Sequence, residues 1–101
     1  MPRPGNMLFL ISYDIPSTPA GDRRRARLAR YLEGIGLRVQ MSVFELDISP
    51  EKLGSICASI EERILLEQDT VRIYPLCGTC ISKVVKLGIE APLEHCSVMI
   101  W

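Results

Sequence analysis

Residues 37–45 read Leu37-Arg-Val-Gln-Met-Ser-Val-Phe-Glu45, and their β-branched and aromatic side chains favour a β-strand. Because side chains alternate between the two faces of a strand, one face is expected to collect a mixed group, namely Arg38, Gln40, Ser42 and Phe44. Such a face would suit a site that holds a phosphate and stacks on a base, because it combines a guanidinium, an amide, a hydroxyl and an aromatic ring. The alternative for the ring is that Phe44 packs in the core of a dimer.

The strand signal extends in both directions from this stretch. Residues 37–48 are too long for one average strand, so we predict two strands with a break near Met41-Ser42. Residues 7–14 also alternate as a strand, and the prolines that follow end it, so Asp14 is expected at a strand terminus facing a loop. Residues 69–76 alternate in the same way and form a fourth strand.

Two helices are predicted between these strands. The first starts between Thr18 and Asp22 and ends at Gly34 or Gly36, as its capping and terminating residues indicate. The second starts at Ser49, because this cap residue is followed by a proline and an acid in the first turn. Apolar residues at helical spacing form the two core stripes, which are Leu28, Tyr31, Leu32 and Ile35 in the first helix and Leu53, Ile56, Cys57, Ile60 and Ile64 in the second.

The element order βαββαβ is the ferredoxin-like pattern, an α+β sandwich in which two helices cover one face of an antiparallel sheet. Short apolar pieces at 84–85 and 98–101 predict an extra C-terminal β-strand. Residues 1–6 are expected to form a flexible N-terminal extension, with residues 7–101 as a single domain. The open sheet face is expected to carry Phe, Tyr and Ile side chains, and a bare apolar face on so small a domain predicts a homodimer through that face.

Composition and charge narrow the function classes. The 101 residues suffice for one domain, and 48% hydrophobic with 24% charged residues excludes a disordered chain. No apolar run approaches the roughly 18–20 residues of a membrane span, so we expect a soluble cytoplasmic protein. The net charge is zero, yet residues 22–38 carry six arginines against two acids, and residues 45–69 carry seven acids against two bases. A concentrated basic element predicts a polyanion site on one face.

Four arginines occur within five residues at the start of the first helix: Arg23, Arg24, Arg25 and Arg27. Exposed helical arginines usually only face solvent, but the helix dipole disfavours cations at this end. A bound phosphate would reverse that cost, because backbone amides and guanidinium groups would then act together. We therefore interpret the run as a phosphate-binding element, since the planar fork of arginine recognises phosphate oxygens in pairs.

Asp14 is the candidate catalytic residue. The alternative is that an aspartate before Ile-Pro-Ser-Thr-Pro simply starts a turn. As a metal ligand it suits Mg²⁺, which takes one or two carboxylates together with waters and substrate phosphates. One aspartate per chain makes a poor site, whereas a twofold dimer that brings two Asp14 carboxylates together makes a better one. Such a metal would activate water for in-line attack on a phosphodiester.

The pair Cys77-Gly-Thr-Cys80 raises the question of a zinc or redox site. Zinc is not expected, because a second properly spaced ligand pair is missing: His95 and Cys96 are adjacent, and Cys57 lies on a helical core stripe. A thioredoxin-like role is not expected either, because we predict no strand leading into Cys77 with a helix leading out of it. We expect ordinary thiols, and no general-base role for His95.

Four segments together resemble the CRISPR-associated protein 2 family in order and spacing, over residues 7–88. They are Tyr13-Asp14-Ile15, Asp22-Arg-Arg-Arg25-Ala-Arg27-Leu, Gly36-Leu-Arg38-Val-Gln40-Met-Ser42-Val-Phe44-Glu45 and Asp69-Thr-Val-Arg-Ile-Tyr-Pro-Leu76. The resemblance implies a ferredoxin-like homodimer with endonuclease activity that depends on Mg²⁺ or Mn²⁺, acting on single-stranded RNA and/or double-stranded DNA. It also implies a role in spacer acquisition in a prokaryotic cytoplasm, where the dimer bridges two dimers of the CRISPR-associated protein 1 integrase and holds the protospacer duplex.

The same resemblance implies roles for individual residues. Asp14 corresponds to the catalytic, metal-binding aspartate. The residues expected to bind nucleic acid are Arg23, Arg24, Arg25, Arg27 and Arg38, and those expected to support the site are Tyr13, Gln40, Ser42 and Phe44. Two other functions stay open at this point: a catalytically inactive nucleic-acid-binding scaffold of the integration complex, and a toxin-like mRNA interferase of the same fold.

Overall fold

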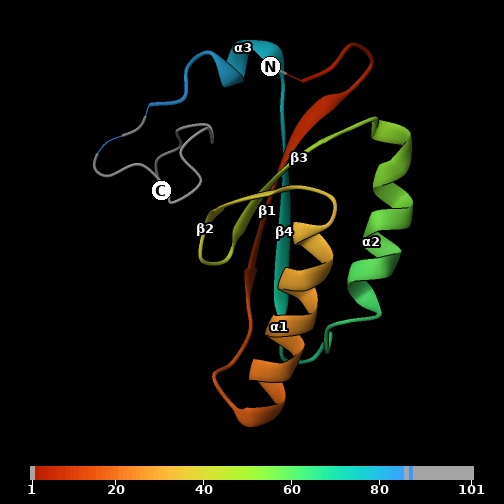
Figure 1. Ribbon diagram of the computed structural model, residues 1–101, viewed down its shortest axis with the longest axis vertical. Coiled ribbons are helices and arrows are strands. Elements are labelled where there is room, and N and C mark those ends of the chain that lie inside the picture. The colour runs from red at the N-terminus through yellow and green to blue at the C-terminus, as the bar shows by residue number, and fades with distance from the viewer. Residues whose placement is uncertain (1, 86, 88–101) are drawn as a thin grey trace.

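The computed structural model describes residues 2–85 and 87. Its elements are β1 (Met7–Asp14), α1 (Pro19–Glu33), β2 (Leu37–Gln40), β3 (Val43–Ile48), the 3₁₀ turn η1 (Pro50–Lys52), α2 (Leu53–Glu61), β4 (Thr70–Leu76) and α3 (Gly78–Ile81). Every strand pairing is antiparallel, and the order across the sheet is β2-β3-β1-β4 (Figure 1). This arrangement confirms the predicted ferredoxin-like α+β fold.

Helix α1 begins and ends where its capping residues predict. Thr18 is the N-cap, and its Oγ1 accepts a hydrogen bond of 2.9 Å from the backbone amide of Gly21. Pro19 occupies the first turn, where a missing N–H costs nothing, and Gly34 is the C-cap. The second helix starts as the 3₁₀ turn η1 at Pro50 before it continues as α2.

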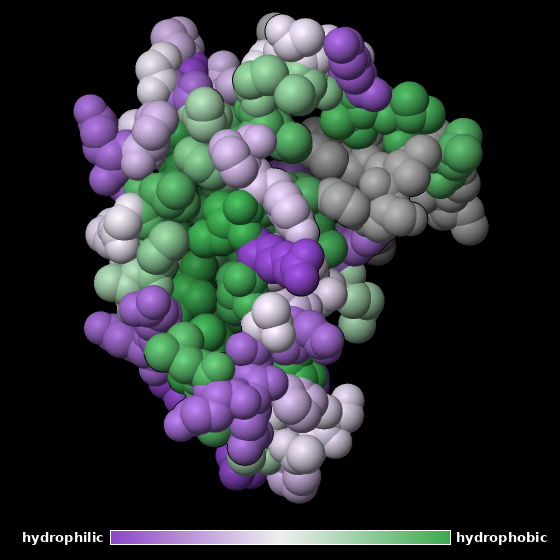
Figure 2. All heavy atoms as spheres, turned by 180° about the vertical axis from the view of Figure 1, so that it is seen from behind, coloured by the Kyte–Doolittle hydropathy of each residue, from purple (hydrophilic) through white to green (hydrophobic). Residues whose placement is uncertain are grey.

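The main core lies between the helices and one face of the sheet. It contains Phe9, Ile11 and Phe44 from the strands, packed with Leu28 of α1 and Ile60 of α2. The expectation about the open face is therefore wrong for the Phe and Ile side chains and for Tyr13, which face the helices. It holds for Tyr74, which pairs with Leu10 across β4 and β1 and is 40% exposed. Figure 2 shows the molecule from behind, with hydrophobic side chains gathered in the middle of this view and hydrophilic ones around them.

A smaller apolar cluster is formed by Leu10, Val39 and Val43. Leu10 alternates with the core residues of β1, so this cluster lies on the opposite face of the sheet. All three side chains are already buried within the single chain, so the cluster is not itself a bare apolar surface. The homodimer itself stays a prediction.

The chain reverses between β2 and β3 at residues 41–42, as the length of this stretch predicts. Phe44 pairs with Arg38 across the two strands, and the register shifts between Arg38 and Gln40. The expected continuous face of alternating residues from Arg38 to Phe44 was wrong, because alternation along one strand does not continue through a reversal. Arg38 and Phe44 still share a face, by cross-strand pairing.

The C-terminal part differs from the prediction in two places. Val84 and Val85 are not in a strand, and residues 98–101 lie outside the described residues. Strand β4 leads directly into Cys77, which caps the short helix α3. The prediction that no strand enters Cys77 with a helix leaving it was therefore wrong, because a four-residue helix leaves little periodicity to detect.

At the other end of the chain, the backbone amide of Arg3 and the side-chain amide of Asn6 donate hydrogen bonds to the carboxylate of Asp47 on β3. The flexibility expected for residues 1–6 stays a prediction. Among the described residues, no helix is both long enough and apolar enough to cross a bilayer.

Candidate nucleic-acid and metal site

The end of β1 lies beside the reversal between β2 and β3. The backbone amide of Tyr13 donates a 3.1 Å hydrogen bond to the carbonyl of Ser42, and its hydroxyl lies 3.5 Å from the carbonyl oxygen of Met41. The structure therefore brings Tyr13, Asp14 and Ser42 together at one end of the sheet, with Gln40 exposed at the end of β2. Four residues chosen from separate parts of the sequence thus belong to one region.

Asp14 is the last residue of β1 and is exposed, opposite Thr70 of β4. No group of three or more His, Cys, Asp or Glu side chains that could hold a metal is present in the described part of the chain. Asp14 is therefore not part of a three-ligand cluster within one chain. An exposed carboxylate of this kind fits Mg²⁺ or Mn²⁺ when waters, substrate phosphates or a second carboxylate complete the coordination.

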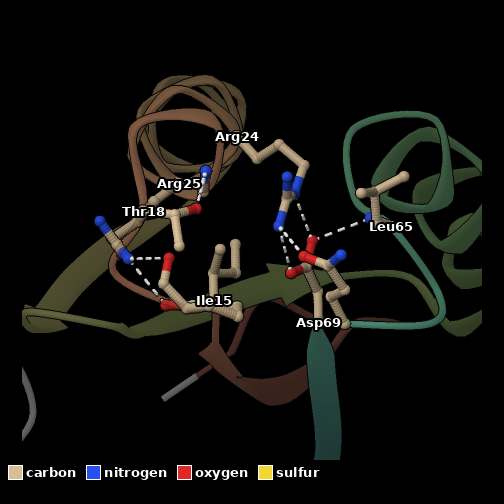
Figure 3. A network of polar contacts seen from close by, with 9 residues as sticks. Ile15, Thr18, Arg24, Arg25, Leu65 and Asp69 are labelled. Atoms are coloured by element: carbon tan, nitrogen blue, oxygen red, sulfur yellow. Dashed lines mark hydrogen bonds and ion pairs between the residues drawn. The ribbon is translucent and has the colours of Figure 1, made fainter.

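Arg25 fixes the loop that follows Asp14. Its guanidinium donates to the carbonyl oxygens of Ile15 at 2.7 Å and Pro16 at 3.0 Å, and to the carboxylate of Asp22 at 2.7 Å. Figure 3 shows this guanidinium reaching back from α1 to the loop. The sequence predicted Arg25 as a nucleic-acid ligand, whereas in this structure its donors hold the backbone next to Asp14.

Gly21 completes the contact between α1 and this loop. A Cβ atom at this position would overlap the backbone oxygen of Pro16. Glycine therefore permits the close approach of the helix start to the loop, and it is a site-positioning residue that sequence reasoning did not single out.

Arg24 is engaged in a buried ion pair. Its Nε and Nη2 atoms donate to the two carboxylate oxygens of Asp69 at 2.7 and 2.9 Å, and the amide of Leu65 donates to Asp69 at 2.8 Å (Figure 3). The hydrogen bond from Arg24 lowers the pKa of Asp69 below its ordinary value, and the amide of Leu65 lowers it further. The same hydrogen bond raises the pKa of Arg24. Sequence reasoning did not predict the contact between Arg24 and Asp69, because a partner 45 residues away leaves no local pattern.

The exposed arginines of α1 are Arg23, Arg27 and Arg30. Within the described residues none of the three forms a hydrogen bond or an ion pair, so their guanidinium groups face solvent. Arg23 and Arg27 are thus the members of the arginine run that are available to a phosphate. Their binding role stays a prediction.

Arg38, Phe44 and Tyr13 form a stack on the helix-covered face of the sheet. The guanidinium of Arg38 lies 5.1 Å from the ring centre of Phe44, and the rings of Phe44 and Tyr13 stack with centroids 6.3 Å apart. Arg38 also lies 3.6 Å from the carboxylate of Glu33. Burial raises the pKa of Tyr13, and the charge of Arg38 opposes this shift.

Phe44 has no exposed surface and belongs to the main core. The expectation that it stacks on a base is therefore wrong, and so is the alternative that it packs in a dimer core. Its contribution to the site is indirect, because it holds Arg38 and Tyr13 in place.

Comparisons with known proteins agree on one family. A family model described as CRISPR associated protein Cas2 matches residues 7–84. The "CRISPR-associated endoribonuclease Cas2 1" of Synechocystis sp. (strain ATCC 27184 / PCC 6803 / Kazusa) is 37% identical over 94 residues, which cover 93% of this chain and 100% of that protein.

Solved structures give the same result. The crystal structure of Streptococcus pyogenes Cas2 at pH 6.5 is similar with a TM-score of 0.74 and 34% identity, covering 81% of this chain and 100% of that one. A chain of the "Partial Cas6-RT-Cas1--Cas2 complex" has a TM-score of 0.70 and 28% identity, covering 93% of this chain and 97% of that one.

Proposed function

The chain belongs to the CRISPR associated protein Cas2 family, and on that premise we propose that it is a metal-dependent endonuclease of CRISPR spacer acquisition. The observation that carries the proposal is the exposed Asp14 carboxylate, which ends β1 beside the 41–42 reversal and precedes a loop held by Arg25. The relative from Synechocystis is named an endoribonuclease, which supports phosphodiester cleavage as the reaction.

Asp14 is the residue that would hold Mg²⁺ or Mn²⁺. When bound, the metal supplies an activated water and offsets charge that develops on the phosphate. A homodimer would bring two Asp14 carboxylates to one shared site, which agrees with the absence of a three-ligand cluster in the described part of one chain. Arg25 holds the Asp14 loop through two carbonyl contacts, so the carboxylate is positioned before substrate binds.

The substrate class is single-stranded RNA and/or double-stranded DNA. Arg23 and Arg27 are exposed on α1, whose N-terminus is joined to the Asp14 loop through the Thr18 cap. Guanidinium groups there would contact backbone phosphates, which positions a nucleic acid without reading its sequence. The partner we propose is the CRISPR-associated protein 1 integrase, and similarity to a chain of the Cas6-RT-Cas1--Cas2 complex supports this pairing.

The test is the variant Asp14→Asn, which keeps the size of the side chain and removes its charge. We expect cleavage of single-stranded RNA and duplex DNA in Mg²⁺ to be lost, with an unchanged circular-dichroism spectrum and elution volume. Asp47→Asn is the matched control, because Asp47 is an exposed acid on β3 that pairs near the opposite end of β1. Cleavage that survives in Asp14→Asn would remove Asp14 from the mechanism.

A second candidate is a non-catalytic scaffold that binds the protospacer duplex. It is favoured by the exposed guanidinium groups of Arg23 and Arg27, which need no metal to hold DNA. Under this function, Asp14→Asn would keep full duplex binding and full support of integration by the integrase. Integration assays with that variant therefore separate the two functions.

A further inference from the structure

Cys77 and Cys80 bring two thiols together on the surface. Their Sγ atoms lie 3.2 Å apart, and the backbone amide of Cys80 also donates to the sulfur of Cys77 at 3.4 Å. Both residues are exposed, and neither is in a disulfide. A disulfide requires an S–S distance of about 2.05 Å, so bond formation needs the sulfurs to approach by roughly 1.2 Å.

The two thiols differ in their surroundings. Hydrogen bonding with the backbone amide and with the thiol of Cys80 lowers the pKa of Cys77, whereas hydrogen bonding with the thiol of Cys77 raises the pKa of Cys80. A thiolate is the attacking species in thiol–disulfide exchange, and the backbone amide of Cys80, 3.4 Å from the sulfur of Cys77, stabilises a thiolate at Cys77. Cys57, by comparison, is half-buried on α2.

We propose that Cys77 and Cys80 form a thiol–disulfide redox site, with Cys77 as the attacking and Cys80 as the resolving residue. The oxidant is the disulfide of a low-molecular-weight thiol. The Cys77 thiolate attacks one sulfur of this disulfide, which forms a mixed disulfide and releases one thiolate. The Cys80 thiolate then attacks Sγ of Cys77, which closes the intramolecular disulfide and releases the second thiolate. Two protons leave the protein thiols and protonate the two released thiolates, so the small disulfide gains the two electrons that the protein loses.

The experiment uses the full chain, oxidised glutathione and peptide mapping after alkylation. Trypsin cleaves after Arg72 and Lys83, so both cysteines fall in peptide 73–83, while Cys57 and Cys96 fall in separate peptides. We expect peptide 73–83 to lose two hydrogen masses before the other cysteines react. In the reduced protein, iodoacetamide at neutral pH is expected to label Cys77 several-fold faster than Cys57.

Two single variants test the order of the steps. Cys80→Ser is expected to stop at a stable glutathione adduct on Cys77, because the resolving thiol is absent. Cys77→Ser is expected to form an adduct on Cys80 several-fold more slowly. Circular dichroism checks that both variants keep the fold. Equal labelling of Cys77 and Cys80, or a wild-type chain that keeps mixed adducts without closing the disulfide, would overturn the proposal.

Discussion

Arg24 and Asp69 join helix α1 to the start of β4 through two hydrogen bonds of 2.7 and 2.9 Å. The arginines of the run therefore differ in their surroundings, because Arg24 faces the protein while its neighbour Arg23 faces solvent. Arg25 is likewise committed, to the carbonyl oxygens of Ile15 and Pro16. A ligand therefore meets fewer available guanidinium groups than the four arginines of the run would suggest.

The first prediction concerns the pH dependence of stability. The folded-state pKa of Asp69 is lowered, so its ion pair contributes stability above the unfolded value of about 3.9 and loses it as the pH falls through the folded value. Asp69→Asn is expected to lower the urea midpoint at pH 7. The difference in urea midpoint between the variant and the wild type should shrink progressively below about pH 4. Urea unfolding followed by circular dichroism between pH 7 and pH 2 measures this. A gap that stays constant over that range would show that the charge of Asp69 is not responsible.

The second prediction concerns nucleic-acid binding. Arg23→Ala combined with Arg27→Ala is expected to weaken duplex binding and to reduce the slope of log K against log salt by about 2 per bound chain, roughly one for each lost phosphate contact. Arg24→Ala serves as the contrast, because its guanidinium is occupied by Asp69. It is expected to lower the thermal midpoint and to leave the salt slope unchanged. Fluorescence anisotropy at several salt concentrations gives both slopes, and equal slopes for the double variant and the wild type would contradict the phosphate role.

The third prediction separates positioning from binding at Arg25. Arg25→Ala releases the loop after Asp14, and cleavage of bound substrate is expected to fall roughly 10- to 100-fold, because small misplacements of a catalytic group are costly. Arg25→Lys should recover part of the rate, since an ammonium can still contact one of the two carbonyl oxygens. Asp22→Asn is the control, because it removes the 2.7 Å ion pair and leaves the carbonyl contacts in place.

Single-turnover kinetics distinguish the outcomes for Arg25. A lower rate at saturating substrate with unchanged affinity supports the positioning role. Weaker affinity with an unchanged single-turnover rate would instead assign Arg25 to nucleic-acid binding, which is the role predicted from the sequence.

The fourth prediction concerns Phe44. Because its side chain is fully buried, Phe44→Ala is expected to lower the free energy of unfolding by about 3–5 kcal/mol, and Phe44→Leu by less. Urea denaturation measures both changes. A small stability loss accompanied by weaker RNA binding would mean that the ring is exposed to a base in solution.

Much of the fold is predictable because its strands are regular. Strand-forming residues at 7–14 and 69–76 and capping residues at Thr18 and Gly34 are local signals, and the structure confirms the elements they predict. The face that the helices cover was not predictable in this way. Both faces of β1 carry apolar side chains, so periodicity alone does not distinguish the covered face from the open one.

The sequence predicted which residues belong to the candidate site, but it did not predict the contacts that they make. Asp14 and Ser42 were singled out from the sequence, and the structure places both where β1 meets the 41–42 reversal. The partners of Arg24 and Arg25 were not found, because one lies 45 residues away and the others are backbone carbonyl oxygens. Pairings of these kinds leave no spacing pattern in a single sequence.

The reversal at residues 41–42 also contains a methionine, Met41, whose oxidation can report whether this end of the sheet is covered. Met41 is 83% exposed. Its backbone carbonyl oxygen lies 3.5 Å from the hydroxyl of Tyr13, the residue that precedes Asp14 in the chain. A thioether in that position oxidises to the sulfoxide at a rate set by its access to peroxide. Anything that covers this end of the sheet, whether a nucleic acid or a second chain, will slow that oxidation, so mass spectrometry of one peptide can follow occupancy without a label.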